Sequence, residues 1–123
     1  MKRMTLLVVT LLAITSTSLT LTAAQAETKV LSTLELKTSC ALTQEPEHRA
    51  FCIGYMSATY DTYLVTRHPD HAKPFICPSQ PAPTRDEVIA GFVDWSNANT
   101  QYDSEPAADN VLRYLGGRFP CKK

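Results

Sequence analysis

The side chains best suited to metal chemistry lie in His68-Pro69-Asp70-His71. Imidazole and carboxylate groups are good ligands for divalent metals. Pro69 keeps the segment out of a helix, however, so the i, i+4 spacing of helical zinc motifs is missing. Clusters of this kind are more often solvated loops, and we expect no metal and no cofactor here.

Four cysteines form the second chemically important set: Cys40, Cys52, Cys77 and Cys121. No two are spaced as C-x-x-C, so a redox motif is absent, and zinc sites built from cysteines normally contain closer pairs. An even number in a short exported chain predicts two disulfides, which leaves no free thiolate to act as a nucleophile. Three pairings remain open. We favour Cys40–Cys52, which would join neighbouring helices, and Cys77–Cys121, which would tie a long loop to the chain end.

Other catalytic patterns are missing from the sequence. There is no G-x-S-x-G nucleophile turn, and the four glycines do not form a phosphate-binding loop. Two carboxylate pairs, Glu45/Glu47 and Asp86/Glu87, lie at expected helix starts, where capping explains them. We therefore expect a binding protein and not an enzyme.

The first 26 residues have the three parts of a secretory signal. Lys2 and Arg3 precede an apolar run at 6–14, and Ala24-Gln25-Ala26 fits a cleavage site. We expect residues 1–26 to be removed and residues 27–123 to form a single domain outside the cytoplasm. Without Lys2 and Arg3 the chain has 10 basic and 12 acidic side chains, which argues against nucleic-acid binding. No later segment is apolar enough to span a membrane.

Hydrophobic spacing predicts two helices in the first half of this domain. The first covers residues 30–42, with Glu35 and Lys37 outside a broad buried face of Val30, Leu31, Leu34, Ala41 and Leu42. The second runs from about Pro46 to Val65, and its inner residues are Phe51, Tyr55, Ala58 and Thr62, flanked by Cys52, Met56, Thr59 and Tyr63. Gly54 costs a helix about 1 kcal/mol relative to alanine. We expect a close helix crossing over Gly54 to offset that cost.

A loop and two further helices complete the predicted fold. Residues 67–83 contain five of the eight prolines, which stiffen this loop. Thr84 and Glu87 are spaced as a capping box that opens a third helix. Ser104 is expected to cap a fourth helix, which Gly116-Gly117 would end in the left-handed conformation. The buried residues expected in these two helices are Val88, Ile89, Phe92, Val93 and Trp95, then Val111, Leu112 and Leu115. The fold class is an all-α, disulfide-bonded bundle of about four helices with one long Pro-rich loop.

Three motifs occur in a recognisable order. Phe51-Cys52-Ile53-Gly54-Tyr55 followed by Asp61 is similar to F-C-x-G-Y-x-x-G-x-x-D, Phe75-Ile76-Cys77-Pro78 precedes a capped helix, and Phe119-Pro120-Cys121 closes the chain. Over residues 31–123 the sequence resembles the Rap1a/Tai family of type VI secretion immunity proteins. It departs from the pattern at Ala58, where the family has a second glycine, and in the proline-rich stretch 79–83.

The resemblance implies a small helical periplasmic protein that binds a toxin, typically a peptidoglycan amidase with a cysteine nucleophile, and blocks its active site. It is also compatible with a homodimer. We expect the loop to carry much of the contact surface, through His68, Asp70, His71, Lys73 and Phe75. We assign structural roles to Gly54, Tyr55, Asp61, Thr84 and Glu87.

Two other functions compete with this one. A periplasmic acid-stress chaperone is also small, helical and disulfide-bonded, and it would expose apolar surface as carboxylates lose and histidines gain charge. An enzyme or metal-binding protein would use His68, Asp70 and His71, and a metal assay on protein purified without an affinity tag would test it.

Overall fold

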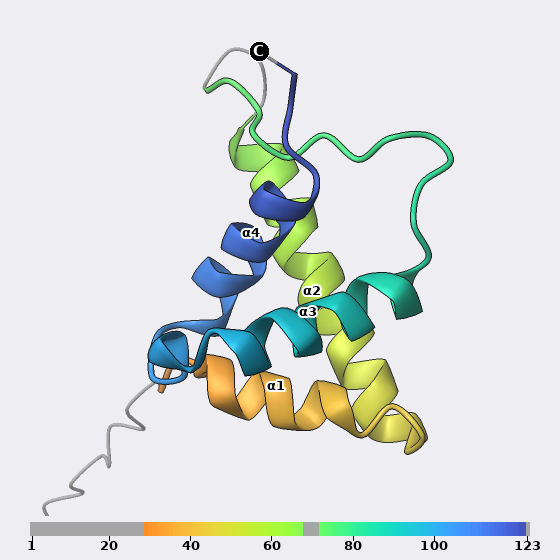
Figure 1. Cartoon of the computed structure of the whole chain (residues 1–123), viewed down its shortest axis with the longest axis vertical. Helices are drawn as coiled ribbons and strands as arrows, with labels where there is room; N and C mark the ends of the chain where they lie inside the picture. Colours follow the sequence, from red (N-terminus) through yellow and green to blue (C-terminus); the bar gives the residue numbers. More distant parts are fainter. Residues whose placement is uncertain (1–28, 68–71, 123) are drawn as a thin grey trace, which may run out of the picture.

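The computed structural model describes residues 29–67 and 72–122 of the chain. Its elements, in order, are α1 (Thr33–Ala41), α2 (Pro46–Thr66), α3 (Arg85–Ala98), the 3-10 helix η1 (Thr100–Tyr102) and α4 (Ala107–Arg118). Helices α1 and α3 lie side by side at one end, and α2 rises away from them with α4 along its C-terminal half (Figure 1). The described residues contain two isolated bridges but no strand, so the all-α prediction is confirmed.

Capping boxes open two of the helices. The Thr84 hydroxyl accepts a hydrogen bond from the Glu87 N–H, and the Glu87 carboxylate accepts one from the Thr84 N–H at 2.7 Å. Ser32 and Glu35 form the same arrangement at the start of α1. Each box satisfies backbone donors that a helix start leaves unpaired, which fixes where the helix begins. The capping box expected from Thr84 and Glu87 is present at the start of α3.

The core lies where all four helices meet. The disulfide Cys40–Cys52 joins α1 to α2 inside it, and the two half-cystines are 2% and 0% exposed. The other buried apolar residues are Leu36, Met56, Tyr63, Ile76, Ile89, Phe92, Ala107, Val111, Tyr114 and Leu115. A core this small leaves little hydrophobic stabilisation to spare, so a crosslink within it matters to stability.

The buried face predicted for α1 is wrong. Val30, Leu34 and Leu42 are exposed, whereas Thr33, Leu36, Lys37 and Cys40 are buried. The cause is the segment that precedes α4, which crosses the start of α1 and donates or accepts several backbone hydrogen bonds there. It brings Asp103 to 2.7 Å from the Lys37 ammonium, so the lysine is held at 8% exposure as half of an ion pair.

Three predictions about glycines and caps are also wrong. Pro106, and not Ser104, occupies the N-cap of α4, which has no side-chain cap. The helix runs through Gly116 and Gly117 to Arg118, and none of the described glycines has a positive φ. Among the described residues, no atom outside the helix's own neighbouring backbone lies within 4 Å of the place where a Gly54 Cβ would be, so none of the four helices crosses there.

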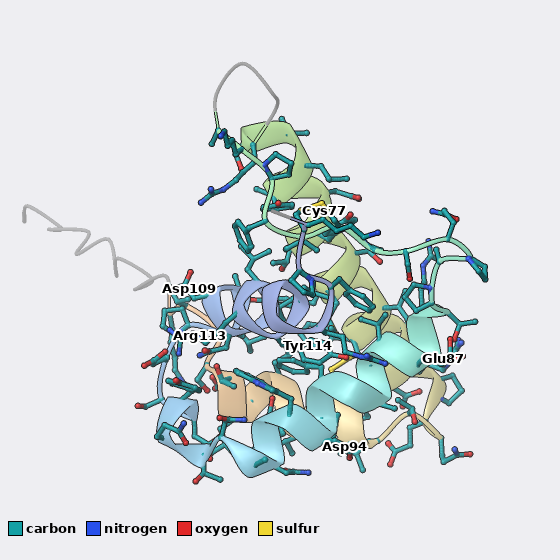
Figure 2. All side chains as sticks on the ribbon, turned by 45° about the horizontal axis from the view of Figure 1, so that its top comes forward. Cys77, Glu87, Asp94, Asp109, Arg113 and Tyr114 are labelled. Atoms are coloured by element: carbon teal, nitrogen blue, oxygen red, sulfur yellow. A yellow bond between two sulfur atoms is a disulfide. The ribbon has the colours of Figure 1, made fainter. Side chains whose placement is uncertain are left out.

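The close approach occurs at Gly91 instead. Tyr114 points from α4 towards α3 (Figure 2), and its hydroxyl would clash with a Cβ on Gly91. The rings of Phe92 and Tyr114 also meet edge to face, with centroids 5.9 Å apart. Burial raises the pKa of the Tyr114 phenol. Gly91 therefore allows the α3–α4 contact that Gly54 was expected to provide elsewhere.

Candidate functional site

The segment 72–83 begins near the C-terminal end of α2, touches the C-terminal tail and then extends outwards to reach α3 (Figure 1). One buried side chain holds its middle. The Tyr63 hydroxyl accepts hydrogen bonds from the backbone N–H groups of Phe75, at 2.7 Å, and Ile76, at 3.0 Å. A helix core residue thus fixes the loop backbone directly, and the loop conformation does not depend on proline stiffness alone.

The tail fixes the same part of the loop from the other side. Cys77 is bonded to Cys121, and its N–H donates to the Phe119 carbonyl at 2.7 Å. Ile76 also forms a bridge with Pro120. The two disulfides in the structure have the pairing that we favoured from the sequence. The loop is therefore attached at three points within three residues.

Phe75 packs against three residues of α2, its C-cap and α4 although its side chain stays exposed at the surface. Its ring lies edge to face on Tyr63 with centroids 4.9 Å apart, and the Arg67 guanidinium is 4.8 Å from the ring centroid. The other side of the ring rests on Gly116, where a Cβ would come within 2.9 Å. Phe75 remains 37% exposed, so it contributes both to packing and to the surface.

The structure describes only two of the five predicted contact residues. Lys73 and Phe75 are both exposed at the same end of the molecule. His68, Asp70 and His71 lie outside the described residues, and their roles stay predictions. Within 29–67 and 72–122, no group of three or more His, Cys, Asp or Glu side chains could hold a metal ion.

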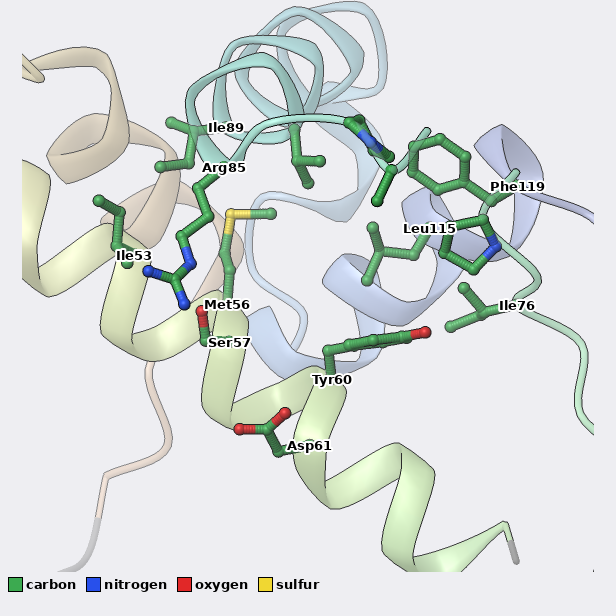
Figure 3. A pocket seen from close by; sticks show the side chains of 14 residues that line it. Ile53, Met56, Ser57, Tyr60, Asp61, Ile76, Arg85, Ile89, Leu115 and Phe119 are labelled. Carbon is green, nitrogen blue, oxygen red and sulfur yellow. The ribbon is translucent and has the colours of Figure 1, made fainter. Parts of the chain in front are cut away.

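An open groove of about 300 Å³ lies under the loop, and its walls come from α2, α3, the loop and the end of α4 (Figure 3). The floor is apolar and consists of Ile53, Met56, Ile76, Ile89, Leu115 and Phe119. The prolines at 78 and 83, with Ala82, form the loop side. The groove is lined mainly by apolar side chains of the loop and of three helices, and it can accept a large apolar group from outside.

Polar side chains are confined to one side of the groove. Ser57 and Asp61 project from α2, and Arg85 reaches from the first position of α3 towards Ser57 (Figure 3). Tyr60 forms part of the wall, and burial raises the pKa of its phenol. The groove therefore combines an apolar floor with a charged margin. Asp61, to which we had assigned a structural role, lies at this margin.

A second surface is the outer face of α2, which we define as Phe51, Gly54, Ala58, Thr62 and Val65. These residues recur every three or four positions, so they share one side of the helix. Phe51 is 46% and Val65 75% exposed, and the three smaller residues are exposed as well. None of these five residues is charged, and no neighbouring element among the described residues covers Gly54. The face predicted to be inner is thus turned outwards, while Tyr55 at its edge is half buried.

Sequence reasoning missed the groove and the position of Arg85 beside it. The groove walls come from residues as far apart as Ile53, Pro83 and Leu115. No local pattern joins these positions. The one available signal was the small and polar spacing of Gly54, Ser57 and Asp61, which marks a side of α2 that large residues do not fill.

None of the helices in the described residues is long and apolar enough to cross a bilayer.

Comparison with known proteins adds one match. A family model described as Rap1a immunity proteins matches residues 32–121, which includes all four helices, the loop and both disulfides. No curated protein and no solved structure matches the chain.

Proposed function

The chain belongs to the Rap1a immunity protein family, and we propose from this that it binds and neutralises a toxin delivered by a type VI secretion system. The match over residues 32–121 is the observation that carries the proposal. We infer that the toxin is a peptidoglycan amidase with a cysteine nucleophile, that it acts in the periplasm and that the bound protein blocks its active-site cleft. Residues 1–26 would direct export and then be removed.

The construction of the loop supports a role in binding. Ordering a loop on association costs about 0.5–1.5 kcal/mol for each immobilised rotamer-rich side chain. Here Tyr63, the disulfide Cys77–Cys121 and the Phe119 carbonyl hold the loop before any partner arrives. An inhibitor built this way loses little entropy on binding, which favours slow dissociation.

A co-expression experiment tests this function. Cells that export a candidate toxin encoded beside this protein should lyse, and co-expression of the full chain should restore growth. A variant that lacks residues 2–26 should give no protection, because it stays in the compartment that the toxin does not attack. Growth without any binding of the purified proteins, or binding without loss of amidase activity, would refute the proposed mechanism.

The contact role of the loop needs a separate test. Lys73→Glu and Lys29→Glu make the same charge change at two exposed positions, but only Lys73 lies in segment 72–83, and Lys29 precedes α1. We expect Lys73→Glu to weaken toxin binding at least tenfold and Lys29→Glu to change it less than threefold, as measured by calorimetry. Equal changes in affinity for the two variants would show that the loop is not the contact surface. Phe75→Ala is a poorer probe because it also removes packing against Tyr63.

We also propose that two copies associate through the outer face of α2. Gly54 and Ala58 would let the two helices approach closely, which supplies the crossing that Gly54 lacks within one chain. Ala58→Arg should then convert a dimer to a monomer in light-scattering measurements, while Thr38→Arg on the exposed side of α1 should not. A monomeric parent protein at millimolar concentration would rule out this interface.

A further inference from the structure

The groove itself has the features of a recognition site, in addition to the loop that forms one of its walls. Its floor is built from side chains of four separate segments, so it exists only in the folded chain. Its walls are held rigidly: Ile76 by the Tyr63 hydroxyl, and the start of α3 by the capping box of Thr84 and Glu87. At about 300 Å³ it lies at the small end of ligand sites, and it is open to the surface. These dimensions suit one large side chain of a partner.

The positive charge beside the groove comes from the start of α3. The N-terminus of α3 carries the positive end of the helix dipole, and Arg85 occupies its first position. The two acidic residues of that turn are engaged elsewhere: Asp86 accepts both hydrogen bonds from Arg49, at 2.8 and 3.1 Å, and Glu87 caps the helix. Asp61 faces the groove from α2 and is the one carboxylate among its lining residues. A planar guanidinium is well suited to bind a carboxylate in bidentate fashion.

We propose that the groove receives a segment of the toxin that presents a large apolar or aromatic side chain next to a carboxylate. The apolar group enters between Met56 and Leu115, and the carboxylate pairs with Arg85. This rests on the proposed function for the identity of the partner. The chemistry of the groove itself can be tested without the toxin, because a small molecule with the same two groups should bind weakly at the same place.

The probes are N-acetyl-phenylalanine and its carboxamide, titrated at millimolar concentration into the isotope-labelled protein obtained by expressing the full chain. Amide resonances of groove residues such as Ile53, Ile89 and Leu115 should shift and saturate. The acid should bind about five- to tenfold more tightly than the carboxamide, since it alone makes a charge-assisted hydrogen bond. Arg85→Gln should abolish that difference, whereas Asp61→Asn should leave the acid bound equally well or more tightly.

Groove-filling variants supply the control. Ser57→Phe and Ala82→Phe insert a ring from opposite walls and should each prevent the shifts. Thr38→Phe, on the exposed side of α1, which contributes no lining residue to the groove, should not. If Ser57→Phe fails to fold, Ala82→Phe on the exposed loop still decides the question. Absence of saturable shifts, equal binding of acid and carboxamide, or a larger loss from Asp61→Asn than from Arg85→Gln would overturn the inference.

The two proposals fail in different ways. Toxin neutralisation that survives both groove-filling variants would leave the immunity function intact and refute the groove as its contact. Binding of the probes by a protein that protects against no toxin would leave the groove intact and refute the immunity function.

Discussion

At the residue scale, the acid sensitivity of the protein should follow from carboxylates at helix starts. The Lys29 ammonium, together with the hydroxyl and N–H of Ser32, lowers the pKa of Glu35 from 4.5 to about 2. The guanidinium of Arg49 lowers the pKa of Asp86, and the N–H and hydroxyl of Thr84 lower that of Glu87. A lowered pKa in the folded state means that the ionised group stabilises the fold.

The sign of this linkage gives a prediction. The contribution of Glu35 is complete above its unfolded pKa, near 4.5, and is lost as the pH falls towards 2. The free energy of unfolding should therefore be constant just above pH 4.5 and decrease between pH 4.5 and 2, as measured by urea denaturation at each pH. In the Glu35→Gln variant the free energy of unfolding should decrease less steeply over the same range. A variant that loses as much stability as the parent between pH 4.5 and 2 would show that Glu35 is not responsible.

A second measurement at low pH separates the immunity role from the chaperone alternative. Protonation of these carboxylates frays helix starts that lie at the surface, while Cys40–Cys52 and the buried core contain no carboxylate that must be neutralised. We expect near-ultraviolet circular dichroism to persist at pH 3 with no gain in dye binding. Reversible loss of that signal would favour the chaperone.

At the scale of elements, two adjacent glycines of α4 have different roles. A Cβ on Gly116 would come within 2.9 Å of the Phe75 ring and push the loop away, whereas none of the described atoms is near the corresponding position of Gly117. Gly116→Ala should destabilise the protein by about 1–3 kcal/mol, as overpacking does. Gly117→Ala should stabilise it by up to about 1 kcal/mol through helix propensity. Thermal unfolding of the two variants provides the comparison, and equal effects would contradict the contact.

The elements themselves could be predicted from the sequence better than their orientations. Helix α3 was predictable because its capping box and its buried residues Ile89 and Phe92 are local signals. The buried side of α1 was not, because Leu34 and Lys37 exchange their expected environments when the segment 103–107 crosses the helix. The groove was unpredictable for the same reason, since its walls are assembled by tertiary contacts between distant segments.

At the scale of the whole molecule, the two disulfides differ in exposure. Cys77 is exposed and Cys121 half buried, whereas Cys40 and Cys52 are enclosed by the core. Mild thiol reductant should therefore open Cys77–Cys121 first, and mass spectrometry after alkylation should find labels on that pair alone. Loss of this crosslink, which spans 44 positions, should cost about 4 kcal/mol. Simultaneous labelling of all four cysteines would contradict the difference in protection.

The order of the bonded cysteines also bears on how the chain matures. Each half-cystine pairs with the next one along the sequence, first with second and third with fourth. A chain that emerges N-terminus first can thus be oxidised stepwise, because the first crosslink closes before the third thiol has appeared. Such a protein needs an oxidase but no isomerase, and its yield should be unaffected in a strain that cannot rearrange wrongly joined cysteines.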